Sequence, residues 1–117
     1  FNQDMAADLA RALLKLEVTD SRPEYQIVDF VNRKGLSLRA DTLLVLTEFL
    51  VVRGVTAEQP WKRLAVRTQQ RALDLRLEDI TRLEGLFRRS GRGNDRVYGM
   101  LQLFARIRED LARYGPA

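Results

Sequence analysis

Apolar residues recur along the chain at the three- and four-residue spacing that is typical of an α-helix with one buried face. Between positions 80 and 87 they stand at Ile80, Leu83, Leu86 and Phe87. No segment alternates strictly between apolar and polar residues with turn residues on both sides, so β-strands are not expected. The pattern therefore predicts an all-α protein.

The apolar stripes predict six helices, and turn residues separate them. Gly54 and Gly91, the latter followed by Gly93, come after two of the stripes, and glycine readily adopts the positive φ that ends a helix. Pro60 suits the first turn of a helix. In chain order, the expected stripes are Met5, Leu9, Ala12, Leu13 and Leu16; Ile27, Phe30 and Val31; Leu43, Leu46, Phe49 and Leu50; Trp61, Leu64 and Ala65; Ile80 to Phe87 as above; and Val97, Met100, Leu101, Phe104, Ile107 and Leu111.

Two stretches 37 positions apart are written in the same hydrophobic code. LSLRADTLLVLTEFLVVRG at 36–54 and LDLRLEDITRLEGLFRRSG at 73–91 both open with L-x-L-R and both close on glycine. The identities over 36–64 and 73–101 are Leu36/Leu73, Leu38/Leu75, Arg39/Arg76, Leu46/Leu83, Gly54/Gly91 and Leu64/Leu101. Residues 1–35 fit the same spacing more loosely, with Tyr25 one position out of register with Trp61.

A period of this length is typical of stacked helical hairpins. We therefore expect one domain, residues 1–117, made of three antiparallel helix-turn-helix units at about 1–35, 36–72 and 73–117. These units would stack as an α-solenoid segment. The alternative, that unrelated helical hairpins with apolar stripes merely look alike, stays open.

The residue types disfavour catalysis. The chain has no histidine and no cysteine, which removes the usual metal ligands, the usual general base and the Cys/His nucleophile arrangements. Its adjacent acids, such as Glu78 and Asp79, point about 100° apart on a helix and do not converge on one atom. We predict a non-enzyme without catalytic residues, metal, cofactor or small-molecule substrate. The uncharged apolar run at 49–52 is far shorter than the roughly 20 residues that span a bilayer, so no membrane partner is expected.

Charge is unevenly placed along the chain. The net charge is +4, with 7 basic and 9 acidic residues in 1–61 against 13 and 7 in 62–117. A basic half favours an anionic partner such as nucleic acid. The predicted nucleic-acid-binding residues are Arg63, Arg67 and Arg71, which form one row on a helix within an acid-free stretch, together with Arg89, Arg92 and Arg96. A solvated surface or an acidic protein partner remains open for this row.

Trp61 and Tyr98 stand at equivalent positions of the last two units. An aromatic side chain at that place can stack on a base. We expect instead that it packs as a wedge between neighbouring units.

The pattern L-x-L-R-x-[D/E], followed by helix-spaced apolar residues, a glycine and an aromatic-led second helix, resembles the FAST-kinase-like (heptatricopeptide-type) repeats of mitochondrial and plastid RNA-binding factors. The resemblance covers residues 36–117 well and the first 35 poorly; pentatricopeptide and tetratricopeptide patterns fit less well. It implies an α-solenoid that holds single-stranded RNA or docks in a mitochondrial ribonucleoprotein. This chain lacks the nuclease-like domain that follows such repeats, so the resemblance carries no catalytic role.

Two functions follow from these expectations. The first is a non-catalytic, intracellular and mitochondrial module that binds RNA, or docks in an RNA-processing complex, through its arginine-rich face. The alternative is a protein-interaction scaffold without nucleic-acid contact, which would use the apolar 43–52 face or the ends of the array.

Overall fold

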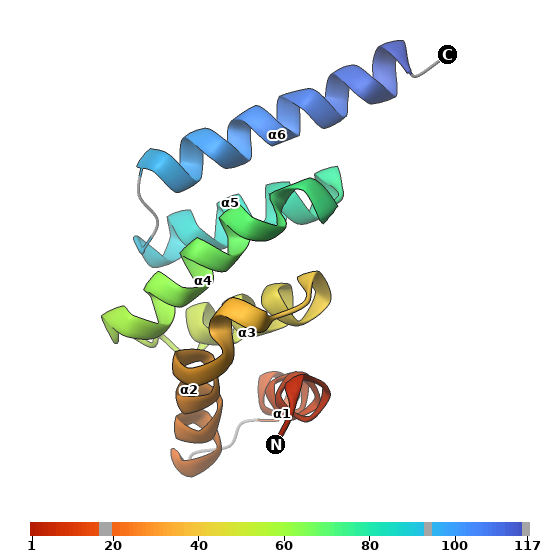
Figure 1. The fold of residues 1–117 in the computed structure, drawn as a ribbon. Coiled ribbons are helices and arrows are strands. Elements are labelled where there is room, and N and C mark those ends of the chain that lie inside the picture. Colours follow the sequence, from red (N-terminus) through yellow and green to blue (C-terminus); the bar gives the residue numbers. More distant parts are fainter. Residues whose placement is uncertain (17–19, 93–94, 116–117) are drawn as a thin grey trace.

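The computed structural model describes residues 1–16, 20–92 and 95–115, and over these residues the protein is all-α (Figure 1). This confirms the all-α part of the predicted fold class. The helices are α1 (Gln3–Lys15), α2 (Arg22–Lys34), α3 (Ala40–Val52), α4 (Glu58–Arg71), α5 (Leu77–Ser90) and α6 (Asp95–Tyr114). Two short 3₁₀ turns, η1 (Gly35–Ser37) and η2 (Ala72–Asp74), follow α2 and α4.

The helix bounds repeat with the 37-residue spacing of the sequence. α1, α3 and α5 begin at residues 3, 40 and 77, and η1 and η2 begin at 35 and 72. The first 35 residues thus share the register that their sequence shows only loosely. The residue at the Trp61 position of the first hairpin is Glu24 rather than Tyr25, and Tyr25 is exposed.

Besides the contacts within each hairpin, the odd-numbered helices contact one another in order along the molecule, and so do the even-numbered helices. α3 contacts both α1 and α5, and α4 contacts both α2 and α6. α3 and α4, like α5 and α6, run in opposite directions, and the two termini lie at opposite ends of the molecule (Figure 1). The resulting shape is elongated, 51 × 26 × 24 Å.

The repeated L-x-L-R segment forms the link between hairpins. Leu38 and Leu75 are buried and extended directly after the 3₁₀ turns. Arg39 and Arg76 then take the extended N-cap position of α3 and α5. At the far ends of these helices Gly54 and Gly91 adopt φ values of 65° and 68°, as predicted; Gly93 lies outside the described residues.

The core runs along the whole stack, centred on α3. Its buried side chains include Leu43, Leu46, Phe49 and Leu50, so the predicted docking face at 43–52 is largely covered by neighbouring helices. Trp61 is 2% exposed, and its ring centroid lies 5.8 Å from that of Phe87 in an edge-to-face arrangement. Its Nε1–H donates to the Val55 carbonyl at 2.8 Å. The prediction of a core wedge at Trp61 is therefore confirmed.

Two predicted stripes were partly wrong. α1 buries Ala6, Ala7, Ala10 and Leu13, whereas Met5, Ala12 and Leu16 of the predicted stripe are exposed and Leu9 is half-buried. Small alanine side chains let the helix approach α3 closely, which rotates the buried face away from the larger residues. In α6 only Val97 and Leu101 are buried.

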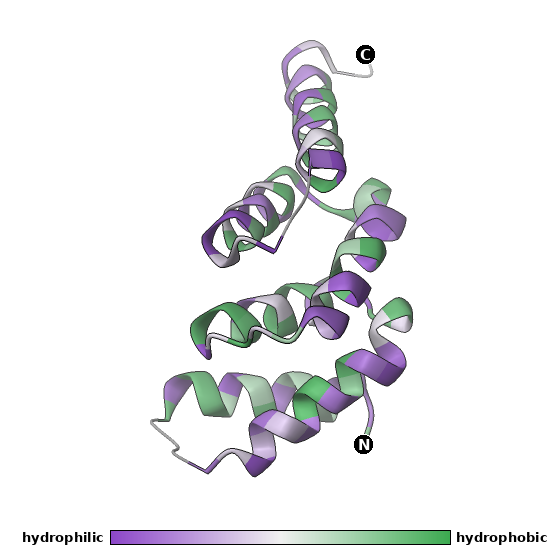
Figure 2. Ribbon diagram, turned by 90° about the vertical axis from the view of Figure 1, so that its left-hand side faces the viewer, coloured by the Kyte–Doolittle hydropathy of each residue, from purple (hydrophilic) through white to green (hydrophobic). Residues whose placement is uncertain are grey.

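The predicted α6 residues Ile107 and Leu111 are 40% and 48% exposed. Their half of the helix extends beyond α5 (Figures 1 and 2). Burial there depends on the length of the partner helix, which the stripe itself does not encode.

Over the described residues, no helix combines the length and the apolar character that crossing a membrane requires.

Candidate nucleic-acid interface

The six predicted arginines fall into two groups in the structure. Arg63, Arg67 and Arg71 share one face of α4, as their four-residue spacing predicts. Arg89 and Arg92 lie at the end of α5, and Arg96 lies at the start of α6. The two groups differ in what surrounds their guanidinium groups.

The α4 row packs against the preceding hairpin. Arg63, Arg67 and Arg71 are each only partly exposed. The Arg63 side chain lies so close to Gly35 that a Cβ at Gly35 would stand 2.7 Å from Arg63 Cβ. Arg71 Nη1 pairs with Asp74 at 3.2 Å, an acid three positions on, in η2.

Arg67 sits at the centre of this row and serves a backbone group. Its Nε donates to the Leu38 carbonyl at 2.7 Å, and Nη1 donates to Gln70 at 3.1 Å. Burial lowers the pKa of Arg67, and the charge of Arg71 lowers it further, while Asp74 raises it. The guanidinium thus supplies a hydrogen-bond donor to the Leu38 carbonyl in the segment before α3, and its charge is partly removed from solvent.

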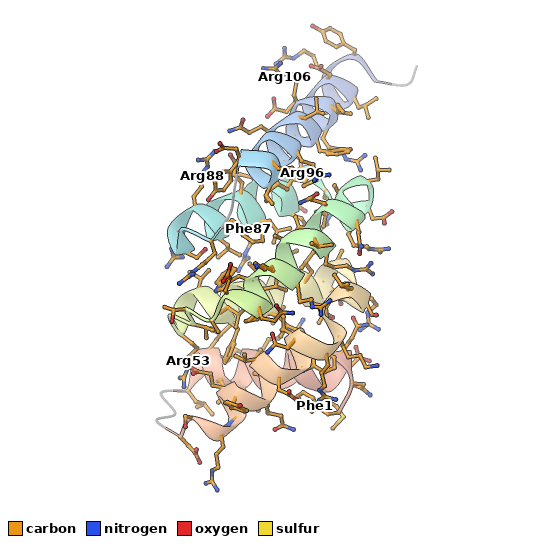
Figure 3. All side chains as sticks on the ribbon, turned by 60° about the vertical axis from the view of Figure 1, so that its left-hand side comes forward. Phe1, Arg53, Phe87, Arg88, Arg96 and Arg106 are labelled. Atoms are coloured by element: carbon orange, nitrogen blue, oxygen red, sulfur yellow. The ribbon has the colours of Figure 1, made fainter. Side chains whose placement is uncertain are left out.

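The arginines at the α5–α6 turn have a different environment. Arg89, Arg92 and Arg96 are exposed, and no carboxylate among the described residues pairs with them. The neighbouring Arg88 is tied down, pairing with Glu84 at 3.1 Å and lying 4.2 Å from the centre of the Tyr98 ring. Figure 3 shows Arg88 and Arg96 flanking the base of α6, with Arg106 farther along it.

Two shallow hollows adjoin this turn, on either side of Trp61. The hollow between α4 and the segment that leads into α6, called the α4–α6 hollow, has a volume of about 250 Å³. It is lined by Glu58, Trp61, Lys62 and Ala65 of α4 and by Gly91 and Arg92, which follow α5. The bridging hollow, of about 190 Å³, lies beside it and includes Arg89, Ser90 and Arg92 together with Trp61 and the 54–56 turn. Arg92 lines both hollows and Arg89 lines the bridging hollow, whereas Arg96 lines neither.

Lys62 is a member of this site that the sequence reasoning missed. It is exposed on α4, pairs with Glu58 at 3.2 Å, and lines the same hollow as Arg92. Because Lys62 precedes Arg63 by one position, it points about 100° away from the arginine row. That offset, together with the repeat register, was the available signal.

Other arginines link neighbouring helices through ion pairs. Arg39 pairs with Asp4, and Arg53 pairs with Glu24 at 2.8 Å. Arg82 pairs with Glu48 of α3. Helical spacing would instead suggest Glu78, which lies four positions earlier in the same helix. These contacts engage basic side chains within the protein, whereas Arg89, Arg92 and Arg96 are exposed and have no acidic partner among the described residues.

The described part of the chain holds no cluster of three or more His, Cys, Asp or Glu side chains that suits a metal ion.

Comparisons of the chain with protein-family models, with curated proteins and with solved structures find no match. The resemblance to FAST-kinase-like repeats therefore stays a prediction from the sequence.

Proposed function

We propose that the chain is a non-catalytic α-solenoid segment of three 37-residue hairpins that binds single-stranded RNA at the α5–α6 turn. The shared helix register and the serial contacts of α1, α3 and α5 support the solenoid. The carrying observation for RNA is the turn cluster, Arg89, Arg92 and Arg96, whose members are exposed and unpaired by any described acid. Arg89 and Arg92 also line the hollows beside Trp61. A mitochondrial ribonucleoprotein is the setting that the sequence resemblance implies for such a module.

The chemistry of the cluster suits phosphates. Guanidinium groups donate several hydrogen bonds in a planar fork that matches phosphate oxygens. Each phosphate neutralised on a single strand releases counterions and contributes about −0.7 to the slope of log K against log salt concentration. Three arginines therefore predict a slope of about −2.

A fluorescence-anisotropy titration with a labelled single-stranded RNA between 50 and 200 mM salt tests the proposal. The site variant Arg89→Gln/Arg92→Gln/Arg96→Gln should lose the salt-dependent affinity. The matched control Arg11→Gln/Arg106→Gln/Arg113→Gln removes the same charge from exposed positions elsewhere. It should retain most of the salt-dependent affinity for RNA. Absence of salt-dependent binding by the parent chain at about 10 µM, or equal losses in both variants, contradicts the proposal.

A second candidate function, a protein-interaction scaffold, is favoured by one surface. Leu103, Ile107, Leu111 and Tyr114 are 56%, 40%, 48% and 76% exposed, and their spacing places them within about 80° on α6. The positions equivalent to Leu103 and Ile107 are Val66 and Gln70 in α4, and Asp29 and Arg33 in α2, so only the last hairpin has apolar residues at both. Contiguous exposed apolar side chains of this kind mark contacts with other proteins.

Affinity capture after RNase treatment separates the two functions. Partners held by α6 survive RNase and are lost from an Ile107→Gln/Leu111→Gln variant, whereas RNA-bridged partners disappear with the RNA. Loss of every partner on RNase treatment contradicts the scaffold.

A further inference from the structure

The α4–α6 hollow has a counterpart one repeat earlier. The α2–α4 hollow, of about 370 Å³, lies between the first two hairpins. Its lining includes Ser21, Glu24, Tyr25, Val28, Gly54 and Val55, which precede by 37 positions Glu58, Trp61, Lys62, Ala65, Gly91 and Arg92. All six lining positions of one hollow thus recur in the other, so the depression is a property of the repeat.

The bridging hollow adjoins the other two, and we refer to the three adjoining hollows as the groove. It shares Gly54, Val55 and Thr56 with the α2–α4 hollow, and Trp61 and Arg92 with the α4–α6 hollow. The lining residues of the groove belong to the first turns of α2 and α4 and to the segments at and after the ends of α3 and α5. A row of adjoining open hollows suits a linear polymer.

The two equivalent hollows differ in chemistry. At one position of the repeat the α2–α4 hollow carries Tyr25, 77% exposed, and the α4–α6 hollow carries Lys62. At another, Val55 in the first corresponds to Arg92 in the second. One end of the groove therefore presents an aromatic face and the other a pair of cations.

The acids that line these hollows are largely neutralised. Glu24 pairs with Arg53 at 2.8 Å, and Glu58 pairs with Lys62 at 3.2 Å. Arg89 and Arg92 remain as charges that no described carboxylate balances. Together with the open Tyr25 ring, this balance favours a ligand that carries both anions and planar rings.

We propose that the α2–α4 and α4–α6 hollows are successive subsites for one strand of RNA, with a base stacked on Tyr25 and phosphates at Arg89 and Arg92. The inference rests on the proposed RNA-binding function and adds the path of the strand. Neighbouring helices pack about 8–10 Å apart. At about 3.4 Å per stacked nucleotide, one repeat then corresponds to two or three nucleotides.

A length series tests the path. The parent chain, Tyr25→Ala and the matched control Tyr114→Ala, whose tyrosine is equally exposed but lies on α6, are titrated with oligouridines of four and ten nucleotides. The parent and the control should bind the ten-nucleotide strand about tenfold more tightly than the shorter one, as one base–aromatic contact predicts. Tyr25→Ala should lose that gain and leave the affinity for four nucleotides unchanged.

A gain-of-function variant tests the equivalence of the two hollows. Val55→Arg places at the α2–α4 hollow the residue type that Arg92 supplies one repeat later. For the ten-nucleotide strand, the variant should steepen the slope of log K against log salt concentration by about 0.7. For the four-nucleotide strand, that slope should be unchanged.

The outcomes separate this inference from the proposed function. If the parent binds neither RNA, the proposed function fails and the path fails with it. If the parent binds both but Tyr25→Ala behaves like Tyr114→Ala, RNA binding stands and the two-subsite path is overturned. A glutamate decapeptide that competes as well as the ten-nucleotide strand shows that the groove takes acidic peptide, which also overturns it.

Discussion

The arginine row of α4 and the arginine cluster at the α5–α6 turn are alike in composition but differ in what they contact. Arg67 donates to a backbone carbonyl and is partly buried, whereas Arg92 stands exposed at the rim of two hollows. Regular spacing placed the first group on one face, yet that face packs against the preceding hairpin. The comparison shows that some arginine side chains contact a neighbouring hairpin while others face solvent.

Trp61 lies under both hollows, and its removal should produce the largest loss. Trp61→Ala deletes a buried ring and its hydrogen bond to Val55, and we expect a loss of about 3–5 kcal/mol in the free energy of unfolding. Chemical denaturation measures this loss. Tyr114→Ala, on an exposed side chain, should stay within about 0.5 kcal/mol; equal losses in the two variants would place Trp61 outside the core.

A methyl group at Gly35 tests how tightly the α4 row is packed. Gly35→Ala places a Cβ 2.7 Å from Arg63 Cβ and should destabilise the fold by about 1–3 kcal/mol. Gly85→Ala, in the exposed interior of α5 with no atom within 4 Å of the new Cβ, should instead stabilise it by about 0.5–1 kcal/mol. Thermal denaturation reads both, and the same sign for both would show that Arg63 is not packed against this turn.

Arg67→Ala should affect stability without changing the salt dependence of RNA binding. It leaves the Leu38 carbonyl without its donor, which we expect to cost about 1–3 kcal/mol. The salt slope should equal that of the parent, because Arg67 points into the fold. A shallower slope would mean that Arg67 reaches RNA.

Arg92→Ala should show the reverse behaviour. Its stability should change by less than about 0.5 kcal/mol, because the side chain is exposed and no described acid pairs with it. Its salt slope should fall by about 0.7, the contribution of one phosphate. Parallel unfolding curves and salt titrations of Arg67→Ala and Arg92→Ala provide the crossed test.

Removal of an arginine that is exposed but paired with an acid should have the smallest effect, a change in the pKa of its partner. Arg22 donates to Asp20 at 2.7 Å and thereby lowers the pKa of that carboxyl. Because the folded pKa is lowered, the pair's contribution is present above the ordinary carboxyl pKa and is lost as the pH falls through the lowered value. Arg22→Ala should return the Asp20 pKa toward its ordinary value, which a carboxyl NMR titration measures; an unchanged titration would contradict the pairing.

The helices and their register were predictable from the sequence because the signals are local. Three- and four-residue apolar spacing predicted the core of α5 at Ile80, Leu83 and Phe87, and the glycines at 54 and 91 marked the helix ends. The 37-residue offset of L-x-L-R located the linking turns. These features depend on backbone geometry within a single hairpin, so one sequence is enough to reveal them.

The environment of each arginine was not predictable, because it depends on contacts between hairpins. The position of Leu38 next to Arg67, and the pairing of Arg82 with Glu48, join residues 29 and 34 positions apart. The exposure of Ile107 depends on where α5 begins, because the antiparallel α6 extends past that end of α5. Lys62 became recognisable as part of the site only once Arg92 was seen across the hollow from it.

The serial packing of the helices also sets the order in which the protein opens. α3 has α1 on one side and α5 on the other, whereas the final turns of α6 extend past α5. In a stack held by nearest-neighbour contacts, local unfolding begins where a neighbour is missing and proceeds inward. Backbone amides of α3 should therefore exchange with solvent deuterium last and those near Leu111 first, so that the ends fray while the centre stays folded.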